Sequence, residues 1–249
     1  PAGFALGVTN VPYVTVTVCS PGSAACVTID HVLVDTGSYG LRLLKSKVAA
    51  LGLPAIAVAA NAANNTPAGN AAECYPFVLG AVWGPLAKAD VGVASELAPA
   101  QTIQLIDDSS PPTPTPQDCI DAAQGGLLSS ASQLQANGIL GIGMVDVDCG
   151  ITCETNTYLG MHAVYYSCPT GGAACMPAAI PMASQVQNPV AGFVAASNGV
   201  KNNNGTLITM PTLPKLGAKV AKGRLVFGIG TQANNQMPLT SKMYPVETD

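Results

Sequence analysis

The chain consists of short apolar runs separated by polar turns, a pattern that predicts strands rather than long helices. Residues 13–18 read Tyr-Val-Thr-Val-Thr-Val, as in a strand with one apolar and one polar face. We expect three strands within residues 13–44, a hairpin at 74–93 and another strand at 101–106. Residues 201–205, Lys-Asn-Asn-Asn-Gly, predict a turn between strands.

Helix signals are short and local. Residues 46–53 predict one short helix, with Ser46 as its N-cap and Gly52 near its end. Residues 61–70 form a polar loop, and residues 109–116 form an extended loop that is stiffened by prolines. The pattern as a whole therefore predicts a mainly β protein with short helices.

The clearest chemistry lies between two of the predicted strands. An apolar run at 32–34 leads into Asp35, Thr36, Gly37 and Ser38, and apolar positions resume at residue 41. A carboxylate that activates water must project from a rigid turn, and glycine lets the backbone bend tightly beside it. The two hydroxyls can hold the turn and the carboxylate in place. We therefore expect these four residues to form a catalytic loop.

This loop and several downstream segments resemble the N-terminal lobe of pepsin-like aspartic peptidases. Ile139, Leu140 and Gly141 resemble the apolar-apolar-Gly segment that packs behind the family's catalytic loop. Residues 180–195 are similar to the short helix and strand that follow it, and residues 222–230 to the strand that ends the lobe. The resemblance spans about residues 8–235 as landmarks in the family's order.

The resemblance implies a fold and domain boundaries. We expect a disulfide-linked pepsin-like β-barrel lobe over residues 1–235, with residues 236–249 beginning the connection to a second lobe that is not present in this chain. The proline-rich loop lies between Asp35 and its packing segment, so we interpret it as an excursion within one lobe. A group of uncharacterised secreted bacterial pepsin-like proteins is closer still, because its members carry Trp-Gly before an Ala-Asp-Val strand, as residues 83–91 do.

The hairpin at 74–93 occupies the position of the family's flap, which closes over substrate and excludes water. The pepsin pattern places a tyrosine on the flap, whereas Tyr75 lies too near the start of this hairpin. We therefore expect Trp83 at the flap tip, with Gly84 beside it, as substrate-binding residues. The alternative is that this lone tryptophan belongs to the core.

The resemblance implies an aspartic endopeptidase that hydrolyses polypeptides at acid pH and needs no metal or organic cofactor. Such enzymes use two Asp-(Ser/Thr)-Gly loops, and this chain has one. A C-terminal lobe or a partner chain would supply the other aspartate. The competing hypothesis is a non-catalytic, secreted binding or surface-structural protein that retains the pepsin-like lobe.

Composition narrows the class of partner. The net charge is −4, only 10% of residues are charged, and no basic block occurs, which argues against nucleic acid and anionic membranes. No apolar run is long enough for a membrane span. The few basic groups would limit self-repulsion in acid, which suits work at acid pH.

The eight cysteines predict a disulfide framework. Nearest neighbours would pair as Cys19–Cys26, Cys149–Cys153 and Cys168–Cys175, which leaves Cys74–Cys119 over a longer loop, although other connectivities are open. Zinc is the weaker interpretation, because no Cys-x2-Cys occurs and the two histidines are not spaced as ligands. Disulfides place the protein in an oxidising compartment: secreted, periplasmic or at the cell surface.

Two further patterns in the sequence bear on other possible sites. Asp146 and Asp148 suggest a calcium loop only weakly, because too few spaced oxygen ligands accompany them. We expect a solvated, disulfide-tied loop there. No Gly-x-Ser-x-Gly occurs, so a serine nucleophile lacks its turn.

Overall fold

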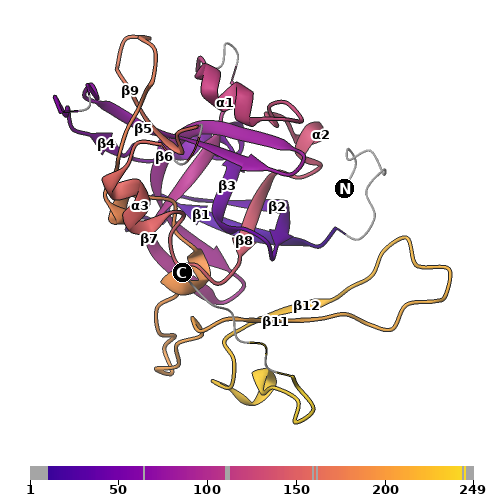
Figure 1. Ribbon diagram of the computed structural model, residues 1–249. Coiled ribbons are helices and arrows are strands. Elements are labelled where there is room, and N and C mark those ends of the chain that lie inside the picture. The colour runs from indigo at the N-terminus through magenta and orange to yellow at the C-terminus, as the bar shows by residue number, and fades with distance from the viewer. Residues whose placement is uncertain are drawn as a thin grey trace.

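Six strands close into a barrel (Figure 1). The computed structural model describes residues 11–63, 65–109, 113–158, 160, 162–242 and 244. The strands pair in the order β1-β2-β8-β3-β7-β6, and β6 pairs with β1 to close the ring. Their bounds are β1 Tyr13–Cys19, β2 Cys26–Asp35, β3 Tyr39–Leu44, β6 Gly80–Val93, β7 Glu96–Ile106 and β8 Gly138–Ile142. The expectation of a mainly β fold with a barrel is confirmed.

The same sheet continues past the barrel. The first half of β6 pairs with β5 (Gly69–Phe77), whereas its second half pairs with β7. Beyond β5 lie β9 (Tyr165–Cys168) and β10 (Met176–Pro177), and β4 (Ala57–Val58) also pairs with β5. The predicted hairpin therefore exists, and it begins earlier than expected.

Alternation of side chains builds the core. Val16 and Val18 on β1 are buried, whereas Thr15 is exposed and Thr17 is partly exposed. All five residues of β8 are buried, because this strand lies between β2 and β3 and is covered on both faces. The barrel interior is filled mainly by Val, Leu and Ile side chains from all six strands of the barrel.

The helices are short. They are α1 Gln117–Ala122, α2 Ala131–Leu134, α3 Gly150–Thr155 and α4 Pro189–Gly192, with 3-10 turns at Lys45–Lys47, Ala49–Leu51, Met182–Ser184 and Ala233–Asn235. In the part of the chain that the structure describes, no helix is long and apolar enough to cross a membrane.

Two predicted elements differ from the structure. The helix at 46–53 is a pair of 3-10 turns that ends at Gly52 with a left-handed φ of 54°, and Ser46 is not its N-cap. The Ser46 amide instead donates to the Asp108 carboxylate at 2.9 Å. No strand forms within residues 180–195, where a short helix and a strand were expected; there Phe193 packs edge-on against Phe227 in the core, with ring centroids 4.9 Å apart.

A separate two-stranded ribbon follows the barrel. It pairs β11 (Thr206–Thr209) with β12 (Arg224–Phe227), which lies within the strand expected at 222–230. Phe227 and Leu225 anchor its base on the barrel core. The connecting loop extends away from the barrel (Figure 1).

The four predicted disulfides are confirmed. They join Cys19–Cys26, Cys74–Cys119, Cys149–Cys153 and Cys168–Cys175. Several residues of the predicted features lie outside the described residues: 1–10 of the expected lobe, 64 of the polar loop, 110–112 of the proline-rich loop, and 243 and 245–249 of the expected connection.

Candidate functional site

Asp35 is the last residue of β2, at the start of a tight loop into β3. Strand β8 lies between these two strands, parallel to β2 and antiparallel to β3. Gly141 is consequently opposite both Asp35 and Gly40. Ile139, Leu140 and Gly141, the expected packing segment, pair with β2 on one side and with β3 on the other.

The loop rests on glycines of β8 because side chains there would collide with its backbone. A Cβ added at Gly141 would lie 2.5 Å from the Tyr39 N and Cα atoms. The amide of Gly143 donates to the carbonyl oxygen of Ser38 at 2.8 Å. Close packing and this hydrogen bond hold the loop in one position.

Asp35 is partly exposed at the start of the loop. Its Oδ1 accepts a hydrogen bond from the Gly37 amide at 2.9 Å, and Thr36 is exposed. Ser38 is buried, and its Oγ has no hydrogen-bond partner among the described residues. The contact that we expected from the Ser38 hydroxyl therefore does not form, because a backbone amide holds the carboxylate instead.

The prediction that Trp83 lies at the tip of the hairpin is wrong. The tip is Val78–Leu79, with exposed fractions of 99% and 78%, whereas Trp83 is 4% exposed. Its ring meets Tyr166 edge-on at 5.2 Å, and its Nε1 donates to the Thr113 carbonyl oxygen at 3.3 Å. The core interpretation of this tryptophan is the right one.

Gly84 also faces the interior of the fold. A Cβ there would lie 1.9 Å from the Leu105 carbonyl oxygen, so the position allows only glycine. This glycine permits β6 to cross close to β7 and does not line an open surface.

Tyr75, which lies too near the start of the hairpin to be at its tip, stacks on a buried arginine. Its ring lies over the guanidinium of Arg42, with Cζ 3.7 Å from the ring centroid. Burial raises the pKa of the Tyr75 hydroxyl, so it stays neutral. The contact joins β5 of the hairpin to β3, which follows the Asp35 loop.

Arg42 is the centre of a fully buried ionic cluster. Its Nη2 donates to Glu73 Oε1 at 2.6 Å and to Asp148 Oδ1 at 3.0 Å. Its Nη1 donates to the Tyr39 carbonyl oxygen at 2.7 Å, and the Tyr39 hydroxyl donates to the Asp148 carbonyl oxygen at 2.6 Å. The cluster therefore ties the Asp35 loop, the hairpin and the segment before α3 together.

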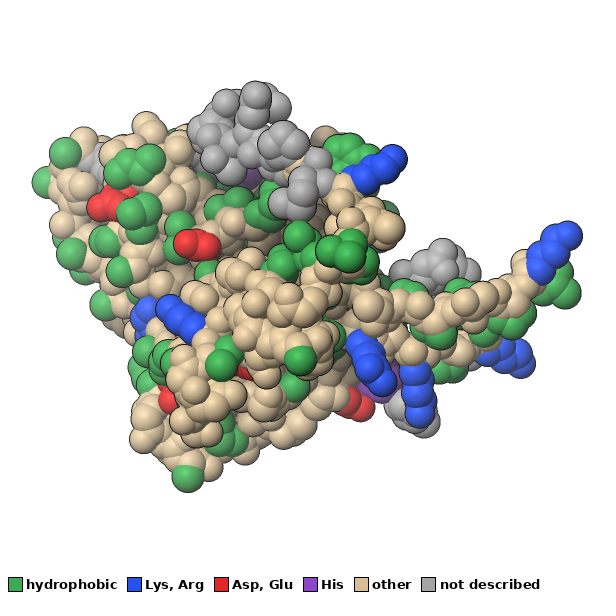
Figure 2. All heavy atoms as spheres, turned by 90° about the horizontal axis from the view of Figure 1, so that it is seen from below, with side chains coloured by type: hydrophobic (Ala, Val, Ile, Leu, Met, Phe, Trp, Pro, Cys, Tyr) green, Lys and Arg blue, Asp and Glu red, His purple; other side chains and the backbone are tan. Residues whose placement is uncertain are grey.

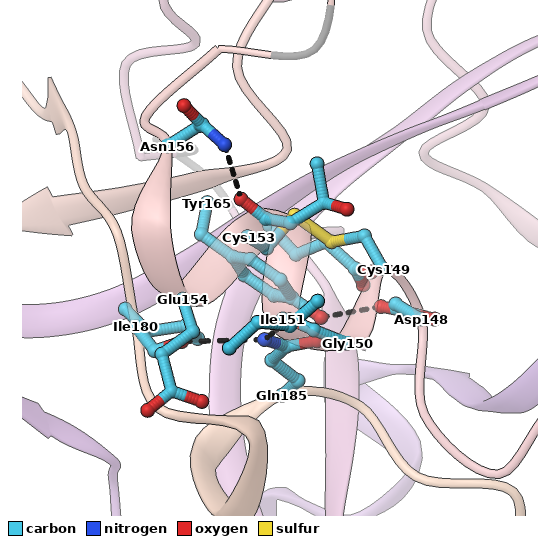
Figure 3. The surroundings of a disulfide bond; sticks show 12 residues. Asp148, Cys149, Gly150, Ile151, Cys153, Glu154, Asn156, Tyr165, Ile180 and Gln185 are labelled. Carbon is cyan, nitrogen blue, oxygen red and sulfur yellow. Dashed lines mark hydrogen bonds between the residues drawn. A yellow bond between two sulfur atoms is a disulfide. The ribbon is translucent and has the colours of Figure 1, made fainter.

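The expected solvated, disulfide-tied loop holds for Asp146, which is exposed, but is wrong for Asp148. This carboxylate is buried beside the Cys149–Cys153 disulfide and accepts a hydrogen bond from the Tyr165 hydroxyl (Figure 3). The signal in the sequence that could have revealed this buried cluster is Arg42, which lies among leucines in a strand. A buried arginine requires carboxylates as partners, and the sequence does not say which ones.

Burial shifts the pKa values of the ionisable groups in the cluster. It raises the pKa of Glu73 well above its ordinary value; the Arg42 charge opposes this shift, and Asp148 reinforces it. Burial also disfavours the Arg42 charge, but attraction to Glu73 and Asp148 outweighs it and raises the pKa of the guanidinium. Glu73 therefore retains its proton at pH values at which an exposed glutamate is ionised.

Two concave pockets lie near the hairpin. One, of about 520 Å³, is lined by residues that include Phe77, Val78, Asp118 and His162. The other, of about 150 Å³, has Trp83 in its wall. Neither lining includes Asp35. Over the described ranges, no three His, Cys, Asp or Glu side chains are grouped to hold a metal ion.

Comparison with known proteins places the chain in a family. No match was found among curated proteins or among solved structures. One family, described as proteins of unknown function (DUF3443), matches residues 2–249. Because this match covers nearly the whole sequence, the chain belongs to the DUF3443 family.

Proposed function

We propose that the protein is a pepsin-like lobe of an aspartic endopeptidase, in which Asp35 is one of two catalytic carboxylates. The insertion of β8 between β2 and β3 carries the proposal, because it fixes a tight turn at which Asp35 is partly exposed and its carboxylate is held by the Gly37 amide. The resemblance to pepsin-like lobes implies this arrangement of loop and packing segment. A structural turn has no need of a carboxylate at this point.

The chemistry requires a second aspartate. One carboxylate, ionised, takes a proton from a water molecule as the water oxygen bonds to the peptide carbonyl carbon. The other, protonated, gives its proton to the carbonyl oxygen, which yields a neutral tetrahedral intermediate. The proton belongs to the pair, so it is not assigned to Asp35. A C-terminal lobe or a partner chain supplies the second carboxylate.

The β5–β6 hairpin has features that suit a flap. Its exposed tip, Val78–Leu79, is apolar and can cover an extended polypeptide and exclude water. Tyr75, stacked on Arg42, fixes the hairpin to the strand that leaves the catalytic loop. We therefore assign the substrate as an unfolded or extended polypeptide with apolar side chains near the scissile bond.

The disulfides support a location for this activity. Four bridges form and persist only in an oxidising environment. The proposed enzyme works after secretion, in the periplasm or at the cell surface.

The test is cleavage of denatured casein at acid pH by the full-length protein from its natural source. Asp35→Asn should abolish cleavage, because an amide can neither take the proton from water nor share one with a second carboxylate. Asp30→Asn is the matched control: this aspartate lies five residues earlier, its side chain is 64% exposed, and the substitution should leave cleavage unchanged. Equal cleavage by Asp35→Asn and the parent would refute the catalytic role.

One observation favours the non-catalytic alternative. The hydrogen bonds and ion pairs found in the described part of the chain give Asp35 no carboxylate partner. Denaturing mass spectrometry with terminal sequencing of the isolated protein separates the two functions. A species that carries a second Asp-(Ser/Thr)-Gly supports the peptidase, whereas a single chain that ends near residue 249 and lacks activity favours a binding protein.

A further inference from the structure

Charge is strongly segregated along this chain. Between residues 155 and 246 there are six of the ten Lys and Arg residues and no Asp or Glu. Four of these cations, Lys215, Lys219, Lys222 and Arg224, fall in the β11–β12 ribbon and its loop. The net charge of −4 is a sum over the whole chain and does not reflect this basic region. The argument from net charge against anionic surfaces therefore does not apply to the ribbon.

The loop of the ribbon also exposes apolar side chains. Leu216 and Val220 have exposed fractions of 99% and 79%, and Met210 and Leu213 are exposed as well. Seen from below, the ribbon extends from the body with green apolar and blue basic side chains together along it (Figure 2). In the described residues, none of its cations takes part in an ion pair.

Exposed aliphatic side chains together with basic ones favour a lipid bilayer as the partner. Aliphatic side chains next to lysines favour a bilayer interface, in which the apolar groups enter the acyl boundary and the ammonium groups meet anionic headgroups. A single-stranded nucleic acid would be bound by aromatic side chains, and the aromatic residue of the ribbon, Phe227, is buried at its base. Binding to a bilayer does not require a pocket in the protein. This agrees with the loop, which is exposed throughout residues 210–220.

We propose that the β11–β12 ribbon docks the protein on anionic lipid bilayers through the loop at residues 210–223. The lysines provide electrostatic attraction, and Leu216 and Val220 insert at the interface. Docking would hold the body of the protein at a membrane surface. The proposal is independent of the role of Asp35.

The test measures co-sedimentation of the protein with phosphatidylcholine vesicles, with and without phosphatidylglycerol. We expect binding only with phosphatidylglycerol, and a loss of binding as salt is added. Combined replacement of Lys215, Lys219 and Lys222 by Gln should weaken the partition coefficient about a hundredfold, since each lysine near the surface contributes about fivefold. Leu216→Ser together with Val220→Ser should also weaken it, about tenfold or more.

Matched controls lie on the body. Val78→Ser with Leu79→Ser removes apolar side chains of nearly equal exposure, 99% and 78%, and Lys47→Gln removes an exposed cation. These variants should bind like the parent, and all variants should keep the parent's melting temperature because the changed positions are exposed. Absence of binding to phosphatidylglycerol vesicles, or equal losses in the body variants, would overturn the proposal. Salt-sensitive self-association that the lysine variant abolishes would instead identify a second copy as the partner, and would also overturn it.

Discussion

At Arg42, one guanidinium joins partners that lie 31 and 106 residues away in the chain. Breaking a buried ion pair by removing one partner leaves the other charge without compensation, which costs about 3–5 kcal/mol. Arg42→Leu should therefore lower the free energy of unfolding by about this amount. Thermal or urea unfolding at neutral pH is the measurement, and a loss within about 0.5 kcal/mol would contradict the cluster.

Glu73 should make the free energy of unfolding fall as pH rises. Most carboxyl groups have the opposite effect, because folding lowers their pKa. Its pKa is raised in the fold, so the native state binds the proton more tightly than the unfolded state does. The stability that this proton contributes is complete below the ordinary pKa of about 4.5 and is lost as pH rises through the raised value. Glu73→Gln mimics the protonated form and should gain stability relative to the parent by about 1.4 kcal/mol per pH unit in this window.

Urea unfolding at several pH values measures that difference. Glu154→Gln is the control, because it removes the same charge at an exposed position outside the cluster. A constant difference between Glu73→Gln and the parent over the whole pH range would exclude the proposed titration of Glu73.

Gly141 provides a test of the loop support that is separate from the charges. Gly141→Ala places a Cβ against the backbone of Ser38 and Tyr39 and should destabilise the fold by about 1–3 kcal/mol. Gly92→Ala, in strand β6, has its nearest contact at 3.6 Å and should be neutral or slightly stabilising. If the two variants have the same melting temperature, the loop does not rest on β8 as described.

At the scale of elements, the features that could be predicted from the sequence are those that depend on the local pattern of residues. The strand at 13–18 follows from its Val–Thr alternation, and the cysteine pairing follows from spacing. Trp83 was misplaced because alternation fixes which residues share a face but not where a hairpin turns. The partners of Arg42 could not be found for a related reason, since only the closed sheet brings β3, β5 and the segment before α3 together.

The Cys74–Cys119 bridge couples two such elements, β5 and α1, across 45 residues. Because a longer closed loop restricts the unfolded chain more, replacing both cysteines by Ala should cost about 4 kcal/mol. The same change at Cys168 and Cys175, which are seven residues apart, should cost about 2 kcal/mol. Urea unfolding of the two double variants gives the comparison, and the reverse order would argue against a loop-entropy origin.

At the scale of the whole molecule, a compact barrel with a buried ionic cluster contrasts with a thin basic ribbon. The barrel is closed by the pairing of β1 with β6, so it has no free edge within its six strands. The ribbon has two strands, and its outer part has no second layer to cover it. The two parts of the molecule should therefore differ in how readily their backbones open.

The barrel and the ribbon also differ in how they are covalently cross-linked. All four bridges join residues between 19 and 175, so nothing covalent spans the ribbon loop except the backbone. Trypsin should cut this loop first, after Lys215, Lys219 or Lys222, because it is exposed and carries three lysines. The nicked protein should run as two pieces in non-reducing detergent gels. In native buffer it should remain one particle, held by the buried side chains of Phe227 and Asn235.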